Sequence, residues 1–122
     1  MEFFFPDDLT PRAVPEETRI TSLRAEPWPD RGRVRVDMEI VPFQKRPHID
    51  VILFDADGEE VAATHIIEPM SWKLEFTLHI RGKPDPAGSY RLEARLYYPE
   101  GGPEAEAVKI EFEIPPPNEH AS

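Results

Sequence analysis

Four segments of this chain alternate between apolar and polar side chains, and this period of two limits the fold more than any other feature. They span residues 33–40, 72–80, 90–98 and 108–114. In the first of them, Val34, Val36 and Met38 alternate with arginine and aspartate. Successive side chains of a strand point to opposite faces, so the pattern predicts antiparallel strands with one buried and one solvated face. No segment of useful length has the apolar spacing of an amphipathic helix. The chain is therefore expected to be all-β.

Three weaker segments complete the predicted set of strands and lie at residues 19–25, 48–54 and 60–67. The second of these has apolar residues on both faces, because Ile52 and Phe54 alternate with Val51 and Leu53. The third follows an Asp-Ala-Asp-Gly sequence, whose Asp-Gly pair favours a hairpin turn. Seven short strands predict a sandwich of two antiparallel sheets.

Prolines separate these segments. The chain has 15 prolines in 122 residues, and they fall mainly between the alternating segments. Proline has no backbone N–H and therefore suits strand ends and sheet edges. The predicted division is an N-terminal arm over residues 1–17, a β-sandwich over 18–114 and a polar C-terminal tail over 115–122.

Charge and cysteine content exclude several functions. The chain has 24 acidic and 14 basic residues and a formal net charge of −10. Such a field repels a polyanion, so nucleic acid is not expected as a partner. The chain has no cysteine. A disulfide framework, a thiol nucleophile and a thiolate metal site are therefore excluded.

No targeting or membrane segment is evident. The chain starts without basic residues and has only three consecutive phenylalanines there, whereas a secretory signal needs a positive region and at least about seven apolar residues. No apolar run approaches the roughly 18 residues of a membrane helix. We expect no membrane partner and a cytoplasmic location, an expectation that is void if the chain is a processed fragment.

One segment carries a resemblance to a known class of domain. Residues 86–92 read Pro-Ala-Gly-Ser-Tyr-Arg-Leu, which resembles the entry to the sixth strand of immunoglobulin-like and fibronectin type III-like domains. The resemblance covers residues 18–114 and implies a seven-stranded antiparallel immunoglobulin-like sandwich. It also implies that Tyr90 folds back as a corner tyrosine and that Leu92 stands where disulfide-bonded members have a cysteine. The chain departs from the pattern in having no cysteine pair and in placing Trp72 on the fifth strand. The resemblance implies no particular function.

Catalytic motifs are missing from the sequence. None of the serines in the sandwich has a neighbouring histidine or a nucleophile-elbow motif; they are Ser22, Ser71 and Ser89. The six glycines are dispersed and form no phosphate-binding loop. Three histidines fall on three different predicted strands, and a fourth lies in the tail: His48, His65, His79 and His120. Nothing in their spacing favours convergence on a metal, so we interpret them as surface or rim residues. The sequence predicts neither an enzyme nor a cofactor.

Acidic residues gather in the loops after the first, third and fifth predicted strands, which share one end of a sandwich. They are Asp30, Asp55, Asp57 and Asp85. Calcium takes six to eight oxygen ligands, and carboxylates on neighbouring loops can supply them. Aspartates also cap tight turns by accepting nearby backbone N–H groups. We interpret these aspartates as turn caps, with a calcium site as the alternative.

The loop between the second and third predicted strands has a different character. It is bracketed by prolines and contains Phe43, Lys45 and Arg46. Aromatic residues beside arginine are typical of protein interfaces, and a stiff loop loses little entropy on binding. We predict these three residues as contact residues. The alternative is a solvated loop whose phenylalanine lies in the edge of the core.

Two further groups of apolar side chains are expected to be shielded from solvent. Ile52, Phe54 and Tyr97 are predicted on the outer face of the sheet formed by the third, sixth and seventh strands, and the chain begins with Phe3, Phe4 and Phe5. Exposed apolar clusters of this size mark contact surfaces. The N-terminal arm is expected to lie across the outer face, or a second copy of the chain to cover it.

The sequence therefore predicts a non-enzymatic binding or assembly module that contacts a protein partner or itself. The first alternative is a calcium- or carbohydrate-binding accessory domain. It would use the aspartates of the turns for calcium, or Trp28 and Trp72 as platforms on which sugar rings stack.

Overall fold

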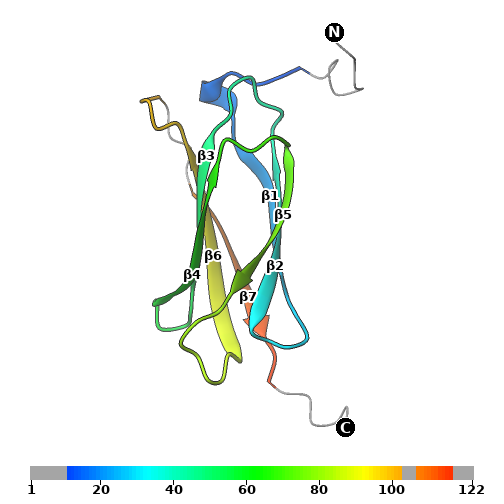
Figure 1. Cartoon of the computed structure of the whole chain (residues 1–122), viewed down its shortest axis with the longest axis vertical. Helices are drawn as coiled ribbons and strands as arrows, with labels where there is room; N and C mark the ends of the chain where they lie inside the picture. Colours follow the sequence, from blue (N-terminus) through cyan, green and yellow to red (C-terminus); the bar gives the residue numbers. More distant parts are fainter. Residues whose placement is uncertain (1–10, 103–106, 117–122) are drawn as a thin grey trace.

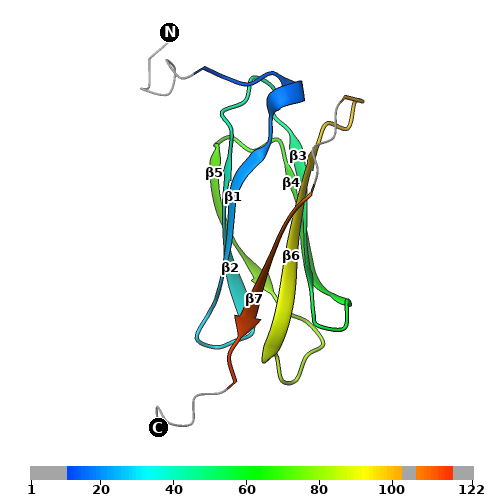
Figure 2. The same ribbon diagram turned by 180° about the vertical axis from the view of Figure 1, so that it is seen from behind.

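The computed structural model describes residues 11–102 and 107–116, and these form two antiparallel β-sheets. The seven strands are β1 (Ile20–Pro27), β2 (Arg33–Ile40), β3 (His48–Phe54), β4 (Glu60–Ile67), β5 (Lys73–His79), β6 (Gly88–Tyr97) and β7 (Val108–Ile114). One sheet has the order β1-β2-β5 and the other the order β4-β3-β6-β7. The two sheets face each other along the long axis of the molecule (Figures 1 and 2). The predicted all-β sandwich of seven strands is confirmed, and β4 joins the sheet of the third, sixth and seventh strands.

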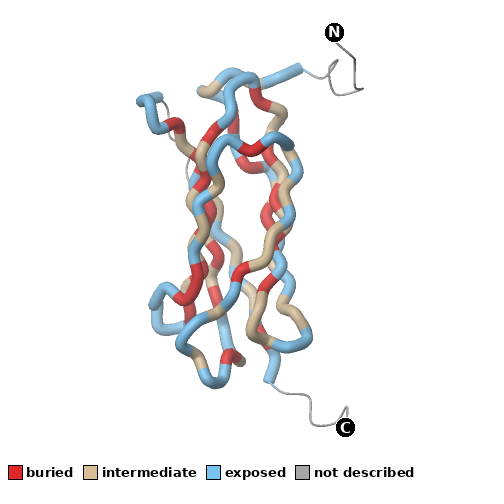
Figure 3. The backbone as a smooth tube through the Cα atoms, in the orientation of Figure 1, coloured by how far each residue is buried: buried red, intermediate tan, exposed pale blue. Residues whose placement is uncertain are grey.

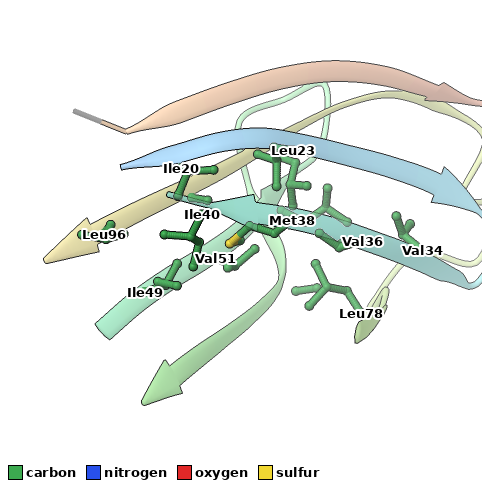
Figure 4. Packing of buried hydrophobic residues seen from close by; sticks show 14 of the residues in the cluster. Ile20, Leu23, Val34, Val36, Met38, Ile40, Ile49, Val51, Leu78 and Leu96 are labelled. Carbon is green, nitrogen blue, oxygen red and sulfur yellow. The ribbon is translucent and has the colours of Figure 1, made fainter. Parts of the chain in front are cut away.

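The predicted alternation matches the burial of the side chains. The inward residues of β2 and β3 are buried, including Val34, Val36, Ile49 and Val51, whereas their neighbours in sequence are at least partly exposed. Figure 3 shows buried residues spaced along the strands of both sheets, and Figure 4 shows the inward side chains of β1, β2 and β3 packed together. Burial of this kind is the main source of stability in a chain without disulfides.

Strand β5 packs less deeply than the other strands of its sheet. Leu78 is buried, whereas Trp72, Leu74 and Phe76 are half-buried and contact the edge of the core. Like β1, strand β5 lies at an edge of its sheet and has a hydrogen-bonded neighbour on one side only. The alternation over residues 72–80 thus predicts which side chains contact the core, and three of these four are only partly buried.

Tyr90 folds back onto the loop that precedes β6. Tyr90 is only 3% exposed, and its hydroxyl donates a 2.6 Å hydrogen bond to the carbonyl oxygen of Pro86. Gly88, between these two residues, has a φ of 137°, a conformation that side-chain-bearing residues rarely adopt. Burial raises the pKa of the Tyr90 hydroxyl above its ordinary value. This contact holds the β5–β6 loop against β6.

The described part of the N-terminal arm lies beside the β2–β3 loop. Ala13 and Phe43 form a parallel β-bridge, in which the Ala13 N–H donates to Pro42 at 2.7 Å and the Gln44 N–H donates to Ala13 at 2.9 Å. A short 3₁₀ turn, η2 (Pro15–Glu17), then leads into β1. The predicted docking of Phe3, Phe4 and Phe5 on the outer face concerns residues outside the described part of the chain. Among residues 11–102 and 107–116, no helix is long and apolar enough to cross a membrane.

Candidate functional site

The outer face of the four-stranded sheet carries a compact group of polar and aromatic side chains at the start of β3 and the ends of β4 and β6. These strand ends lie at the upper end of the sandwich in Figure 1. We call this group the histidine face, and it consists of His48, Asp50, His65, Ile67, Arg95 and Tyr97. Its members come from three neighbouring strands, β4, β3 and β6. All six are exposed or half-buried.

Strand register places these residues in two adjacent rows. In the first row, His48 on β3 pairs with Ile67 on β4 and with Tyr97 on β6. In the second row, Asp50 pairs with His65 on β4 and with Arg95 on β6. Directly opposed and diagonal neighbours on one face of a sheet are close enough for their side chains to interact. The pairing therefore brings together residues that are far apart in the sequence.

His65 is at the centre of this arrangement. Its Nδ1 atom lies 2.5 Å from a carboxylate oxygen of Asp50, while its Nε2 atom lies 3.3 Å from both His48 Nδ1 and the Tyr97 hydroxyl oxygen. A carboxylate beside Nδ1 accepts the proton of that nitrogen, so in the neutral ring the lone pair lies on Nε2. The lone pair of His65 consequently points towards His48 and Tyr97.

Arg95 supports the other side of the group. Its guanidinium lies 3.6 Å from the second carboxylate oxygen of Asp50 and 5.4 Å from the ring centroid of Tyr97. The rings of His48, His65 and Tyr97 have centroid separations between 5.4 and 5.9 Å. Each of these side chains is thus held by at least two neighbours.

His48 is half-buried and His65 and His79 are exposed, in keeping with their interpretation as surface or rim residues, but sequence reasoning did not bring any two of them together. His48 and His65 meet on the outer face, whereas His79 lies on β5 in the other sheet. His120 is outside the described residues. Spacing along the chain gives no hint of the contact, because it depends on how β4 and β6 pair with β3. Sequence reasoning would have needed the register of these strands to predict the contact.

The apolar residues expected on this sheet are where the alternation places them. Ile52 and Phe54 continue the outer face of β3 below the histidine face, and both are half-buried. The guanidinium of Arg91 lies 4.9 Å from the ring centroid of Phe54 and also pairs with Glu93 at 2.6 Å. Side chains of β6 therefore supply part of the cover that this apolar surface requires.

The three contact residues predicted in the β2–β3 loop differ in burial and in their ion pairs. Phe43 is 6% exposed and contacts Trp72 edge-on, with ring centroids 6.4 Å apart. Its prediction as a contact residue is wrong, and the alternative of a phenylalanine in the core edge is correct. Lys45 pairs with Glu100 at 3.3 Å. Arg46 is exposed and makes no ion pair within the described residues.

The β1–β2, β3–β4 and β5–β6 loops lie at the opposite end of the sandwich, the lower end in Figure 1, and three of their aspartates act as turn caps. Asp55 accepts hydrogen bonds from the backbone N–H groups of Asp57 and Glu59, both at 2.9 Å, and pairs with Lys83 at 3.2 Å. The Glu59 N–H, followed by Lys83 and the Asp57 N–H, lowers the pKa of Asp55. These contacts use the carboxylate of a residue that is itself buried.

Two other aspartates follow the same pattern. Asp30 accepts from the Gly32 N–H at 3.0 Å, and Asp85 accepts from the Ala87 N–H at 3.2 Å. Within residues 11–102 and 107–116, no three His, Asp or Glu side chains are placed together to hold a metal ion. The geometry of Asp30, Asp55 and Asp85 is that of turn caps, whereas Asp57 takes part through its backbone N–H, and the four carboxylates do not form a calcium site.

The two tryptophans each have an arginine over the ring. The guanidinium carbon of Arg33 lies 3.9 Å from the ring centroid of Trp28, and that of Arg12 lies 5.4 Å from that of Trp72. Trp72 also lines a surface recess of about 480 Å³, together with Ile40 and Pro42. Of the two tryptophans proposed as stacking platforms, only Trp72 therefore adjoins this recess.

Comparison with known proteins identifies no family. No protein-family model and no curated protein matches the chain. Among solved structures, the chain is similar to Bifidobacterium dentium β-glucuronidase in complex with coumarin-3-O-glucuronide, with 18% sequence identity and a TM-score of 0.48. The similarity covers 84% of this chain but only 18% of the glucuronidase chain. A likeness of this extent carries no argument about function, and the β-sandwich assignment depends on the strand pairing described above.

Proposed function

We propose that this protein is a non-enzymatic binding module that contacts another protein through the histidine face and the adjoining loops of the upper end. The observation that carries the proposal is the exposure of two large apolar side chains at this place. Ile67 is 63% exposed and Met70 is 81% exposed. Ile67 pairs with His48 in the row that ends at Tyr97, and Met70 lies in the β4–β5 loop, which a backbone hydrogen bond joins to the loop that carries Arg46. Methionine, tyrosine and arginine are enriched at protein interfaces relative to the remaining surface.

The loops beside this surface are stiff. Pro47 and Pro69 are buried, and the Glu68 N–H donates to the Pro47 carbonyl at 3.0 Å. This bond joins the β2–β3 loop to the β4–β5 loop. Binding by a segment that is already ordered loses less conformational entropy than binding by a mobile one. The arrangement thus suits recognition with little rearrangement.

Charge favours a partner different from this chain. The protein has a net charge of −10, so a second copy is repelled at long range and a neutral or basic protein is not. Basic groups nevertheless lie around the proposed surface, among them Arg46 and Arg95. A suitable partner presents an apolar patch for Ile67 and Met70 and a carboxylate for Arg46.

Two observations support the immunoglobulin-like, fibronectin type III-like variety of sandwich. The strand orders β1-β2-β5 and β4-β3-β6-β7 are compatible with it, and Tyr90 makes the corner hydrogen bond.

The hydrogen-bond partners of the serine hydroxyl groups support the non-enzymatic part of the proposal. Ser71 accepts from the Lys73 N–H, Ser89 donates to Glu113, and within the described residues no serine hydroxyl contacts a histidine.

The test is capture of partners by the wild-type chain and by two double variants. Ile67→Glu with Met70→Glu places charge on the proposed surface. Thr21→Glu with Ala56→Glu adds the same charge at exposed positions elsewhere and is the control. We expect a protein that the wild type and the control capture and the first variant does not. Its purified form should bind with at least tenfold weaker affinity to the first variant.

Two results would contradict the proposal. One is a set of captured proteins whose purified forms bind the wild type and the Ile67→Glu, Met70→Glu variant equally well. The other is sedimentation of the purified wild-type chain as a dimer that the same variant dissociates, since the occupant of the surface is then a second copy.

A carbohydrate-binding function is the second candidate, and the recess beside Trp72 favours it. Aromatic rings next to a concave surface are suited to stacking against sugar rings. Titration with neutral oligosaccharides, followed by tryptophan fluorescence, tests it. Binding that Trp72→Ala abolishes and Trp28→Phe leaves intact would support this candidate. The same titration curve in both variants would exclude the recess.

A further inference from the structure

The separation of the two imidazoles on the histidine face matches that of two ligands on one metal ion. His48 Nδ1 and His65 Nε2 are 3.3 Å apart. Two nitrogens bound to Zn²⁺ at 2.0–2.1 Å in a tetrahedral site are separated by about 3.3–3.4 Å. A square-planar ion with similar bond lengths brings neighbouring nitrogens to about 2.8–3.0 Å. Without a metal the 3.3 Å contact is a hydrogen bond between the two rings, and its length suits two ligands of a tetrahedral ion better than two of a square-planar one.

We propose that the histidine face binds Zn²⁺ between His48 Nδ1 and His65 Nε2, with the Tyr97 hydroxyl beside it. The site is separate from the aspartates of the lower end, and it does not depend on the proposed protein partner. It uses two neutral imidazoles, which are common ligands of zinc in proteins.

Asp50 prepares His65 for this role. Its carboxylate lies 2.5 Å from His65 Nδ1 and favours the proton on that nitrogen, so the lone pair on Nε2, which faces His48 and Tyr97, is the one that a metal would take. A carboxylate on the far nitrogen is the arrangement that orients most metal-binding histidines and makes the imidazole more basic. Arg95 holds the second oxygen of the same carboxylate at 3.6 Å. Asp50 is thus a positioning residue that acts through His65.

The surroundings limit the strength and the type of the site. The Tyr97 hydroxyl oxygen is 3.3 Å from His65 Nε2, and the side chain of His65 is 41% exposed, so water can reach a bound ion. The described residues supply two imidazoles and a phenol, with no third histidine or carboxylate aimed at the same point. Such a site leaves one or more positions open to water, as zinc sites with an exchangeable ligand do.

The test is titration of the full chain with ZnCl₂ at neutral pH by isothermal calorimetry. We expect one zinc ion for each chain. His48→Gln and His65→Gln should each weaken binding at least tenfold, and Asp50→Asn should weaken it by roughly 10-fold or more, as loss of such a carboxylate does elsewhere. His79→Gln, on the exposed face of β5, is the control and should bind zinc as the wild type does.

Three results would overturn the proposal. They are no zinc binding by the wild type at millimolar concentration, the same affinity in His48→Gln and His65→Gln as in the wild type, or loss of binding in His79→Gln. Thermal melting without metal shows whether each variant is folded. If a variant is unfolded, the histidine ¹⁵N resonances of the wild-type chain are measured with and without zinc instead. Zinc must then shift the resonances of His48 Nδ1 and His65 Nε2, and shifts confined to other histidines contradict the site.

Discussion

The lower-end turns and the histidine face both gather ionisable side chains, but these side chains have different partners. At the lower end, Asp30, Asp55 and Asp85 accept hydrogen bonds from backbone N–H groups two to four residues away. On the histidine face, His65 contacts His48 and Tyr97, which are 17 and 32 residues away in sequence. The first group stabilises its own loops, and the second is a surface arrangement of side chains.

This difference teaches where binding chemistry is to be sought in a small sandwich. A carboxylate close in sequence to free N–H groups is used by the turn, so a cluster of such residues predicts loop geometry. Side chains that meet only through strand pairing do not hydrogen-bond to the backbone of their own segment. Their bonding capacity is therefore directed at one another and at solvent, where a ligand can compete for it.

The two tyrosines of β6 provide the strongest test of the comparison, because the same substitution can be made at both. Tyr90→Phe removes the 2.6 Å bond and leaves the Pro86 carbonyl buried without its donor, which should lower the free energy of unfolding by about 1–3 kcal/mol. Tyr97→Phe removes a hydroxyl at a half-exposed site, and its effect should be below about 0.5 kcal/mol. Urea denaturation of the two variants measures both values. Equal losses would show that the histidine face is as structural as the lower end.

Acid unfolding of Asp55→Asn should give the next largest effect. The pKa of Asp55 is lowered in the folded state, first by the Glu59 N–H. The carboxylate therefore contributes stability above its unfolded pKa of about 3.9, and this contribution is lost as the pH falls through the lower folded value. The wild type should melt at a higher temperature than Asp55→Asn near pH 7, and the gap should narrow below about pH 4. A gap that does not change with pH would mean that the charge of Asp55 is unimportant.

The strands and the aspartate caps were accessible from the sequence because both depend on local patterns. Alternation over seven to ten residues identifies a strand and its inward face, and an Asp-Gly pair identifies the β3–β4 turn. The bond of Tyr90 to Pro86 also spans only four residues. Each of these predictions needs only neighbours along the chain.

The histidine face and the bridge between Ala13 and Phe43 were not accessible in the same way. The contact of His48 with His65 requires the register of β4 against β3, and a slip of one residue reverses the facing of every side chain. Phe43 is buried beside Trp72 and bridged by Ala13. A loop bracketed by prolines gives no sign that a preceding segment of the chain pairs with it. Long-range pairing, more than composition, decided both outcomes.

The histidines should contribute little to stability if the comparison is right. His48→Gln and His65→Gln remove side chains that are exposed or half-buried and whose partners are on the surface. Pairs of this kind contribute little because solvent screens them, so each variant should retain the wild-type free energy of unfolding within about 0.5 kcal/mol. Chemical denaturation without metal measures it. A loss well above this range would make the two imidazoles part of the structural framework.

Calcium should have no effect at all on melting. A ligand present at 100 times its dissociation constant adds about 2.7 kcal/mol of stability, and in a domain of this size each kcal/mol raises the melting temperature by roughly 4–8 °C. The oxygens of Asp55 are engaged by Asp57, Glu59 and Lys83, so the lower end has to break its own caps before it can hold a cation. We therefore expect the same melting temperature in millimolar calcium and in a chelator. A clear rise in calcium that Asp57→Asn removes would show that these turns bind the ion, and that their hydrogen bonds give way to it.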